Sequence, residues 1–179
     1  GKKSLRNRYP EIDYWLLNPG KIKINFEIKH IPNLYWTAAS IGGLIKAGKG
    51  SAETIVLLPQ VGLLLDTALK LDPSWRNGSI YTALISYTMS EFPVSNEKIK
   101  RVKYYFSEAV RLSDGKDASP YLAYAESVSV KNQDRDKFIQ LLNKALAIPS
   151  IDDEEIHLQN IIAGNRAKWL LSRTDELFY

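Results

Sequence analysis

The sequence predicts an all-α fold in which three helical hairpins stack into a short solenoid closed by a C-terminal capping helix. Two observations carry this prediction: an apolar stripe that recurs three times, and a second helical pattern before each recurrence. The composition agrees, since 45% of the 179 residues are hydrophobic and 25% are charged, as in an ordinary folded domain. A chain of this length buries roughly 70% of the surface that it exposes when unfolded, so we expect an ordered core.

The recurring stripe is centred on an alanine that is followed by a branched apolar residue. Apolar residues lie seven and three positions before this alanine and three positions after it. Side chains at these offsets share one face of a helix. Each stripe therefore predicts an amphipathic helix with a small residue at a tight helix crossing. The three stripes are Val61, Leu65, Ala68 and Leu71; Val102, Phe106, Ala109 and Leu112; and Phe138, Leu142, Ala145 and Ile148.

Each stripe follows a helical pattern that begins with an aromatic residue and continues one turn later with small or aliphatic residues. Breakers such as Asp72-Pro73 and Pro149 then end the second helix. This order is typical of tetratricopeptide (TPR) repeats. Ala109 lies 41 residues after Ala68 and 36 before Ala145, so the repeats are degenerate and have longer loops than the regular TPR of about 34 residues. The first-helix patterns are Trp36, Ala39, Ser40 and Gly43; Tyr81, Leu84, Ile85 and Thr88; and Tyr121, Tyr124, Ala125 and Val128.

The hairpins are expected over 33–71, 79–112 and 119–148, and a capping helix over 152–177. Four acidic residues open the capping helix, where they suit the positive end of the helix dipole. Its apolar residues are expected to cover the last hairpin, as the end of a solenoid requires. They are Leu158, Ile161, Ile162, Trp169 and Leu170. We therefore expect a TPR-like domain over 33–179.

In the N-terminal segment, residues 1–32, the sequence predicts a short helix over 9–17 and an irregular linker over 21–31. Apolar and polar residues alternate from Ile22 to Ile28, as in a strand, but no second strand is available to pair with it. The first residue is Gly rather than Met, so we expect this segment to be the remnant of a longer N-terminal region.

The composition argues against several classes of function. The chain has no cysteine and only two histidines, which excludes thiolate chemistry and multi-histidine metal sites. The net charge of +4 arises from interspersed signs, so we expect no nucleic-acid partner. No apolar run is expected to span a bilayer.

One segment imitates a phosphate-binding loop. Gly43 to Lys49 has the glycine, the four-residue gap and the Gly-Lys of a P-loop, but Gly50 stands where a hydroxyl must bind magnesium, and no strand precedes the segment. We favour a glycine-terminated helix over nucleotide binding. No catalytic set and no cofactor site is expected elsewhere, so the chain is predicted not to be an enzyme.

The aromatic residues give the best candidates for a binding surface. The first helices of a TPR stack line its concave face, where partners bind. Tyr35, Tyr87 and Tyr124 are the candidate ligand- or partner-binding residues, because tyrosine offers both a ring and a hydroxyl. A packing role is favoured for the residues at the repeat positions. These are Trp36, Ala68, Tyr81, Ala109, Tyr121 and Ala145.

Four stretches, in order along the chain, resemble the T components of tripartite ATP-independent periplasmic (TRAP) transporters. The resemblance runs from about residue 33 to the end, while residues 1–32 match only loosely. The stretches are Leu34–Ser40, Leu71–Trp75, Ser119–Val130 with Gln133–Arg135, and Asn165–Leu171 through Phe178.

The resemblance implies an accessory protein without catalytic activity, held in the periplasm by a lipid anchor outside this chain. It further implies binding to the periplasmic solute-binding component of the transporter, assembly into a homo-oligomer such as a trimer, and a small hydrophobic or organic-acid ligand. Two alternatives remain: a general TPR adaptor for proteins unrelated to transport, and a nucleotide-dependent enzyme acting through Gly48 and Lys49.

Overall fold

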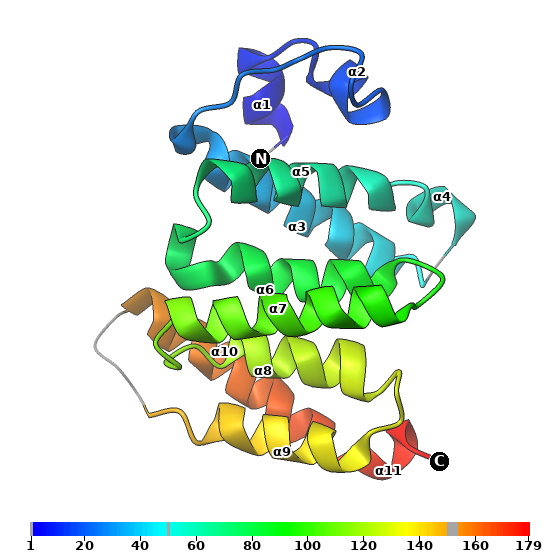
Figure 1. The fold of residues 1–179 in the computed structure, drawn as a ribbon, viewed down its shortest axis with the longest axis vertical. Helices are drawn as coiled ribbons and strands as arrows, with labels where there is room; N and C mark the ends of the chain where they lie inside the picture. Colours follow the sequence, from blue (N-terminus) through cyan, green and yellow to red (C-terminus); the bar gives the residue numbers. More distant parts are fainter. Residues whose placement is uncertain (1, 50, 150–153) are drawn as a thin grey trace. The chain divides into compact units, whose positions relative to one another are not determined.

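The computed structural model describes residues 2–49, 51–149 and 154–179 (Figure 1). Over these residues the chain is helical and contains no β-strand, which confirms the predicted all-α class. The chain divides into two compact units, Gly1–Arg76 and Asn77–Tyr179. The TPR-like solenoid, and the division of the chain at residue 33, stay predictions.

The first unit holds a hairpin of two long helices, α3 (Ile31–Ala47) and α5 (Leu58–Leu71), which pack against each other. The short helix α4 (Ala52–Ile55) lies in their connection. Two short helices and a 3₁₀ turn precede the hairpin, and α1 packs on α3. These are α1 (Lys2–Arg8), α2 (Ile12–Leu17) and η1 (Ile28–His30).

The N-terminal segment differs from the single helix expected over 9–17. The expected helix begins later, as α2 at Ile12, and a further helix, α1, precedes it over Lys2–Arg8. Tyr9, Pro10 and Glu11 lie between the two helices, and Pro10 has no N–H to donate to a preceding turn. The linker expected over 21–31 is irregular up to Glu27 and contains no strand, as predicted. It ends in η1, which leads directly into α3.

The buried face of α3 is not the predicted one. Ile31, Leu34 and Ala38 are buried, together with Thr37, and the stripe predicted from Trp36 is exposed. Burying branched apolar side chains removes more apolar surface from water than burying small ones, which favours the observed face. The exposed residues of the predicted stripe are Trp36, Ala39, Ser40 and Gly43.

Helix α5 confirms its predicted stripe, since Val61, Leu65 and Ala68 are buried. Contrary to the sequence-based expectation, the stretch Ala52–Leu71 is long and apolar enough to cross a membrane by length and composition alone. Its α5 portion packs along α3, and the same test is passed by core helices. Of the most apolar window in this stretch, 33% is buried inside the protein.

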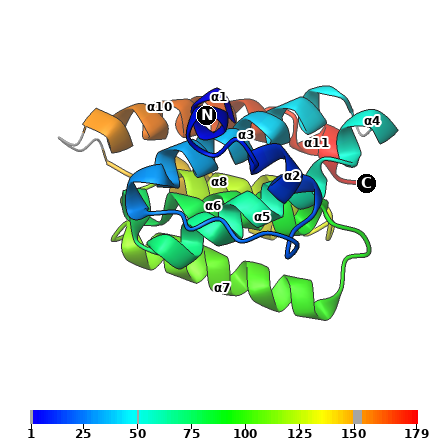
Figure 2. The ribbon, with the colours of Figure 1, turned by 90° about the horizontal axis from the view of Figure 1, so that it is seen from above.

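The second unit contains two hairpins and a final helical segment (Figures 1 and 2). Helix α6 contacts α7 through Tyr81 and Tyr104, and both helices contribute to a core that includes Ile85 and Val102. Helix α8 packs on α9. Helix α8 continues as η2, a single π-helical turn, and α10 packs on both α8 and α9. The elements are α6 (Trp75–Ser90), whose first two residues belong to the first unit, α7 (Asn96–Leu112), α8 (Ser119–Tyr124), η2 (Ala125–Ser129), α9 (Arg135–Leu146), α10 (Glu154–Leu171) and α11 (Thr174–Leu177).

The helix ends follow from local chemistry. The Ser95 hydroxyl accepts a hydrogen bond from the backbone N–H of Lys98 at the start of α7, and Asp134 accepts one from Lys137 at the start of α9. Helix α7 ends at Leu112, the predicted end of the second hairpin. Most positions of the stripes predicted for the second unit are buried. These positions are Tyr81, Leu84, Ile85, Thr88, Val102, Ala109, Tyr124, Ala125, Val128, Phe138, Leu142 and Ala145.

The predicted capping helix is formed in part. It is interrupted after Leu171 and resumes as α11, and the first predicted residues, 150–153, lie outside the described part of the chain. Of the predicted capping residues only Leu170 is buried. Ala163 and Ala167 are buried instead, because their small side chains let α10 approach its neighbours closely. The exposed ones are Leu158, Ile161, Ile162 and Trp169.

Candidate functional site

The three candidate tyrosines are not gathered on one surface within either unit. Tyr35 belongs to the first unit, whereas Tyr87 and Tyr124 belong to the second. The Tyr87 hydroxyl donates to the carboxylate of Glu91 at 3.1 Å and its side chain is half-buried. Tyr124 is buried with its ring edge-on to Phe106 at 5.1 Å, and this burial raises the pKa of its hydroxyl. The role of these tyrosines in binding stays a prediction.

The residues predicted to pack the repeats are mostly buried. Ala68, Tyr81, Ala109 and Ala145 lie in the core, and Tyr81 is so enclosed that desolvation raises its pKa to about 12. Tyr121 is half-buried and packs edge-on against Phe106, with ring centroids 5.5 Å apart.

Trp36 departs from that group, since 49% of it is exposed. It lies in an aromatic cluster of the first unit with Tyr35 and Trp75, whose rings are centred 4.9 Å apart. The guanidinium of Arg76 lies 5.7 Å from the centre of the Trp36 ring and 5.4 Å from that of Trp75, within the range of cation–π attraction. Trp36 is therefore a surface residue held by an arginine rather than a core residue.

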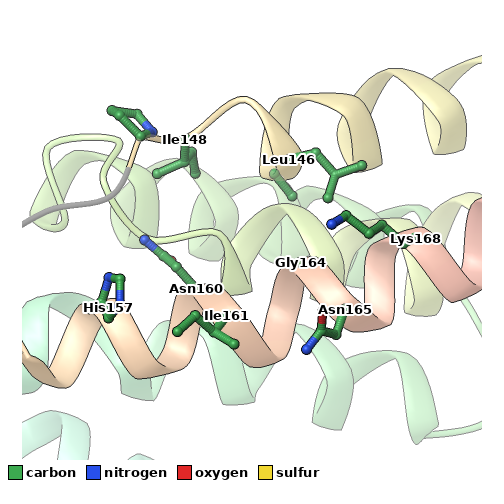
Figure 3. A pocket seen from close by; sticks show the side chains of 10 residues that line it. Leu146, Ile148, His157, Asn160, Ile161, Gly164, Asn165 and Lys168 are labelled. Atoms are coloured by element: carbon green, nitrogen blue, oxygen red, sulfur yellow. The ribbon is translucent and has the colours of Figure 1, made fainter.

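A pocket of about 270 Å³ opens between α10 and the chain that leaves α9 (Figure 3). Leu146 and Ile148 form one wall, and Ile161 forms part of the α10 side. Gly164 lies beneath Leu146, and a Cβ atom added to it would lie 3.8 Å from the Leu146 side chain. Gly164 thus contributes bare backbone to the lining of the pocket.

Among the described residues that line the pocket, Lys168 carries the one permanently charged side chain. Figure 3 shows this lysine running back along α10 above Gly164, so that its amine lies below Leu146. Among the described residues Lys168 forms no ion pair. The other polar groups at the pocket are the His157 imidazole and the amides of Asn160 and Asn165.

Asn160 has a structural role at the edge of this pocket. Its Oδ1 accepts a hydrogen bond from the backbone N–H of Ala118 at 2.8 Å, and its Nδ2 donates to the carbonyl of Lys116 at 2.8 Å. These two bonds hold the loop between α7 and α8 against α10. Asn160 therefore holds the loop at the edge of the pocket through both ends of its amide group.

The outer face of α10 forms a second feature of the same helix. We call the exposed residues Leu158, Ile161, Ile162, Asn165 and Trp169 the α10 stripe; they recur at spacings of three and four residues and so share one helix face. Their four apolar members are 44–61% exposed. A contiguous exposed apolar patch of this kind is typical of an interaction surface.

Trp169 is held in place at one end of the α10 stripe. The guanidinium groups of Arg166 and Arg173 lie 4.2 and 4.8 Å from the centre of its ring. Both arginines are fixed in turn by carboxylates, Arg166 by Glu126 at 2.6 Å and Arg173 by Glu176. The tryptophan is therefore exposed, with two guanidinium groups against its ring.

The segment that imitates a P-loop has the geometry of a helix end. The backbone N–H of Gly48 donates to the carbonyl of Leu44, and Lys49 takes the left-handed conformation with φ of 49°. Helix α3 precedes the segment, whereas a P-loop follows a strand. Gly50 lies outside the described residues. Over the described ranges no three histidine, cysteine or acidic side chains converge as metal ligands would.

The chain matches a protein-family model described as the TRAP transporter T-component over residues 21–178. It is also similar to a protein of Treponema pallidum (strain Nichols) described as an uncharacterized protein, with 23% identity over 152 residues. That alignment covers 79% of this chain and 47% of the relative, so the chain spans about half the length of this curated relative.

Proposed function

The chain belongs to the TRAP transporter T-component family, an accessory component of a TRAP transporter, and we propose that it acts there by binding the solute-binding component. On this proposal it is a binding subunit that performs no catalysis. The resemblance further supports a periplasmic location, a lipid anchor outside this chain and assembly into a homo-oligomer such as a trimer. A small hydrophobic or organic-acid ligand belongs to the same proposal.

The observation that best supports a binding role is the α10 stripe. Its apolar side chains lie on the face of α10 opposite the buried Ala163 and Ala167, so the packing of the second unit leaves them uncovered. Leaving these residues in water forgoes roughly 25 cal/mol for each Å² of apolar surface, which a partner that covers them would recover. We propose that the solute-binding component is this partner.

Trp169 has the properties of an interface anchor. Tryptophan and arginine are the residue types most enriched among those that dominate binding energies. Because Arg166 and Arg173 already hold the ring, a partner would meet a fixed side chain and would lose little rotamer entropy on binding. The three candidate tyrosines, Tyr35, Tyr87 and Tyr124, stay as further proposed contacts.

The test is sedimentation velocity of this chain with the solute-binding protein encoded beside it, at tens of micromolar. We expect co-sedimentation of the unmodified chain, and at least a roughly ten-fold loss of affinity for Ile162→Asp, which places a charge in the middle of the α10 stripe. Val56→Asp is the matched control, because Val56 is similarly exposed but lies in the first unit.

The possible outcomes test two things separately: whether the chain binds the solute-binding component, and whether the α10 stripe is the surface that does so. Separate boundaries for the two unmodified proteins at these concentrations would contradict the transporter role and favour a general adaptor. Co-sedimentation that is equally strong for Ile162→Asp would retain the role but reject the α10 stripe as the contact. The mass of the chain alone would show whether it forms a trimer.

A further inference from the structure

We propose that the turn between α6 and α7, residues 91–95, docks on a lipid bilayer that contains anionic phospholipids, with Phe92 and Val94 inserted among the lipid headgroups. This contact is made by the chain itself and is separate from the lipid anchor and from the binding of the solute-binding component. Its test uses vesicles without any protein partner, so the two proposals can fail separately.

The turn presents its apolar side chains to water. Phe92 is 84% exposed and Val94 is 39% exposed, and Pro93 between them is exposed as well. Figures 1 and 2 show the turn extending beyond the ends of α6 and α7. A phenylalanine at such a projecting position adds nothing to the core of the unit, whereas its transfer from water into the boundary region of a bilayer is favourable.

Ion pairs hold the base of the turn. The Glu91 carboxylate accepts a hydrogen bond from the hydroxyl of Tyr87 at 3.1 Å. The same carboxylate pairs with Arg101 at 3.5 Å and with Lys98 at 3.8 Å. These contacts tie the end of α6 to the first turns of α7, so Phe92 projects from a closed turn.

The charges around the turn are mostly positive. Residues 91–103 carry four basic and two acidic side chains, and Glu91 is one of the two acidic ones. Lys131 adds a further cation, since its ammonium group lies 5.2 Å from the centre of the Phe92 ring and donates to the carbonyl of Met89. The four basic residues are Lys98, Lys100, Arg101 and Lys103.

This combination of charge and apolar surface matches an anionic bilayer. Basic side chains beside an inserted apolar group attract anionic lipids, and their long stems lie along the acyl boundary while the charged ends reach the phosphates. A bilayer without anionic lipids offers the apolar contact but lacks this attraction. The surface around Phe92 therefore selects for anionic lipids.

The small size of the turn favours a bilayer over a protein as the docking partner. A stable protein interface buries about 800 Å² on each side, from roughly 20–30 residues. The turn offers three exposed apolar residues, and α7 continues from it with exposed charged side chains such as Lys100 and Lys103. A bilayer requires no matching shape, because binding depends on the apolar area that enters it and on charge.

The test is co-sedimentation of the chain with vesicles of phosphatidylcholine that contain about 30% phosphatidylglycerol, in about 100 mM NaCl. We expect binding to these vesicles and at least about ten-fold weaker binding to vesicles of phosphatidylcholine alone. Raising the salt to about 500 mM should weaken binding to the anionic vesicles, because salt screens the attraction between the basic side chains and the lipids.

Two variants with matched controls test the residues. Phe92→Asp should weaken vesicle binding at least about ten-fold, and its melting temperature should stay unchanged because the ring is exposed. Leu17→Asp is its control, since it places the same charge at a leucine of the first unit that is 69% exposed. Lys131→Met should weaken binding about five-fold, the effect of one basic residue at an anionic surface, whereas Lys144→Met on α9 should not.

Insertion of the turn can be measured directly, because the chain has no cysteine and one introduced thiol can be labelled alone. Val94→Cys carrying an environment-sensitive fluorophore should shift its emission to the blue on anionic vesicles and should be quenched by lipids with brominated acyl chains. Asn143→Cys, at an exposed position of α9, is the control and should show neither change.

The proposal is overturned if the chain does not sediment with the anionic vesicles at about 1 mM lipid, or if it binds neutral vesicles equally well. It is equally overturned if either charge variant behaves like its control, or if the labels at positions 94 and 143 respond alike. Loss of binding to the solute-binding component in Phe92→Asp, with vesicle binding retained, would assign the turn to a protein partner instead. None of the vesicle results depends on the solute-binding component.

Discussion

A Cβ atom added to Gly78 would lie 3.1 Å from the Cα atom of Ala109, at the crossing of α6 and α7. The same atom would lie 3.2 Å from the Cβ of Leu112. Gly78 also has a φ of +89°, in the left-handed region that side-chain-bearing residues rarely adopt. The alanine that recurs through the three stripes thus meets a glycine at this crossing, and the two helix backbones approach closely.

Gly78→Ala is therefore expected to lower the free energy of unfolding by about 2 kcal/mol or more, from the positive φ and the close contact together. Urea unfolding followed by circular dichroism measures the change. Gly42→Ala is the control, because an added Cβ there meets nothing within 4 Å inside α3, and it should raise stability by about 0.5–1 kcal/mol. Equal effects of the two variants would contradict the tight crossing.

Asn160→Ala is expected to release the loop between α7 and α8 from α10. The variant loses two hydrogen bonds and leaves the Ala118 N–H and the Lys116 carbonyl without their partner, which should cost about 1–3 kcal/mol. Hydrogen exchange at the Ala118 amide should become faster. Asn165→Ala, at an exposed position of the same helix, should change stability by less than about 0.5 kcal/mol. Unchanged exchange at Ala118 in Asn160→Ala would reject the role of these bonds.

The second helices of the hairpins could be predicted because the apolar residues of each helix lie on a single face, so only that face can be the buried one. On α7, for example, Val102 and Ala109 are buried, while the side chains of Lys100, Arg101, Lys103 and Arg111 are exposed. Polar starts at Ser95 and Asp134 and breakers after the stripes fixed the helix ends locally. Spacing and capping chemistry together were sufficient for these elements.

Helix α3 shows where periodicity fails. Two stripes of helical spacing run along it, one through Ile31, Leu34 and Ala38 and the other through Trp36 and Gly43. Both fit a period of 3.6 residues, and only the neighbouring helices decide which is covered. The same ambiguity affects α10, whose small alanines are buried while its larger apolar residues are exposed.

The pocket could not be predicted because its walls come from two segments whose approach depends on the packing of α10. Leu146 and Ile148 leave α9, whereas Ile161 and Lys168 lie more than a dozen residues later. One signal was present in the sequence: Gly164 interrupts a good helical segment, and a glycine in that place indicates a packing or functional requirement.

Phe178→Ala is expected to loosen the C-terminal segment from α9. The Phe178 ring packs edge-on against the fully buried Phe138, with centroids 5.0 Å apart, and Gln133 holds the neighbouring backbone by accepting from the N–H of Tyr179. Loss of this partly buried ring should lower the free energy of unfolding by about 1–3 kcal/mol. Tyr179→Ala, which removes a fully exposed ring next to it, should have less than about 0.5 kcal/mol of effect. The reverse order of the two variants would contradict this docking.

His30 is expected to make the stability of the chain depend on pH. The imidazole is 4% exposed, and its Nδ1 accepts a hydrogen bond from the backbone N–H of Glu27 at 3.0 Å. Burial, reinforced by the nearby Arg8, lowers the pKa of His30 below its ordinary value of 6.5. As pH falls below about 6.5, the unfolded chain therefore binds a proton that the folded chain resists, and stability is lost.

His30→Phe isolates this contribution. The variant keeps a buried ring but loses the acceptor for the Glu27 N–H, so it should be less stable than the unmodified chain by about 1 kcal/mol at pH 7.5. Because phenylalanine binds no proton, the stability difference between the two proteins should shrink as the pH falls from 7.5 to 5. Urea unfolding at both pH values measures that difference. A difference that stays constant or grows would show that His30 takes up its proton as readily in the folded chain as in the unfolded one, and that its burial has no effect on acid stability.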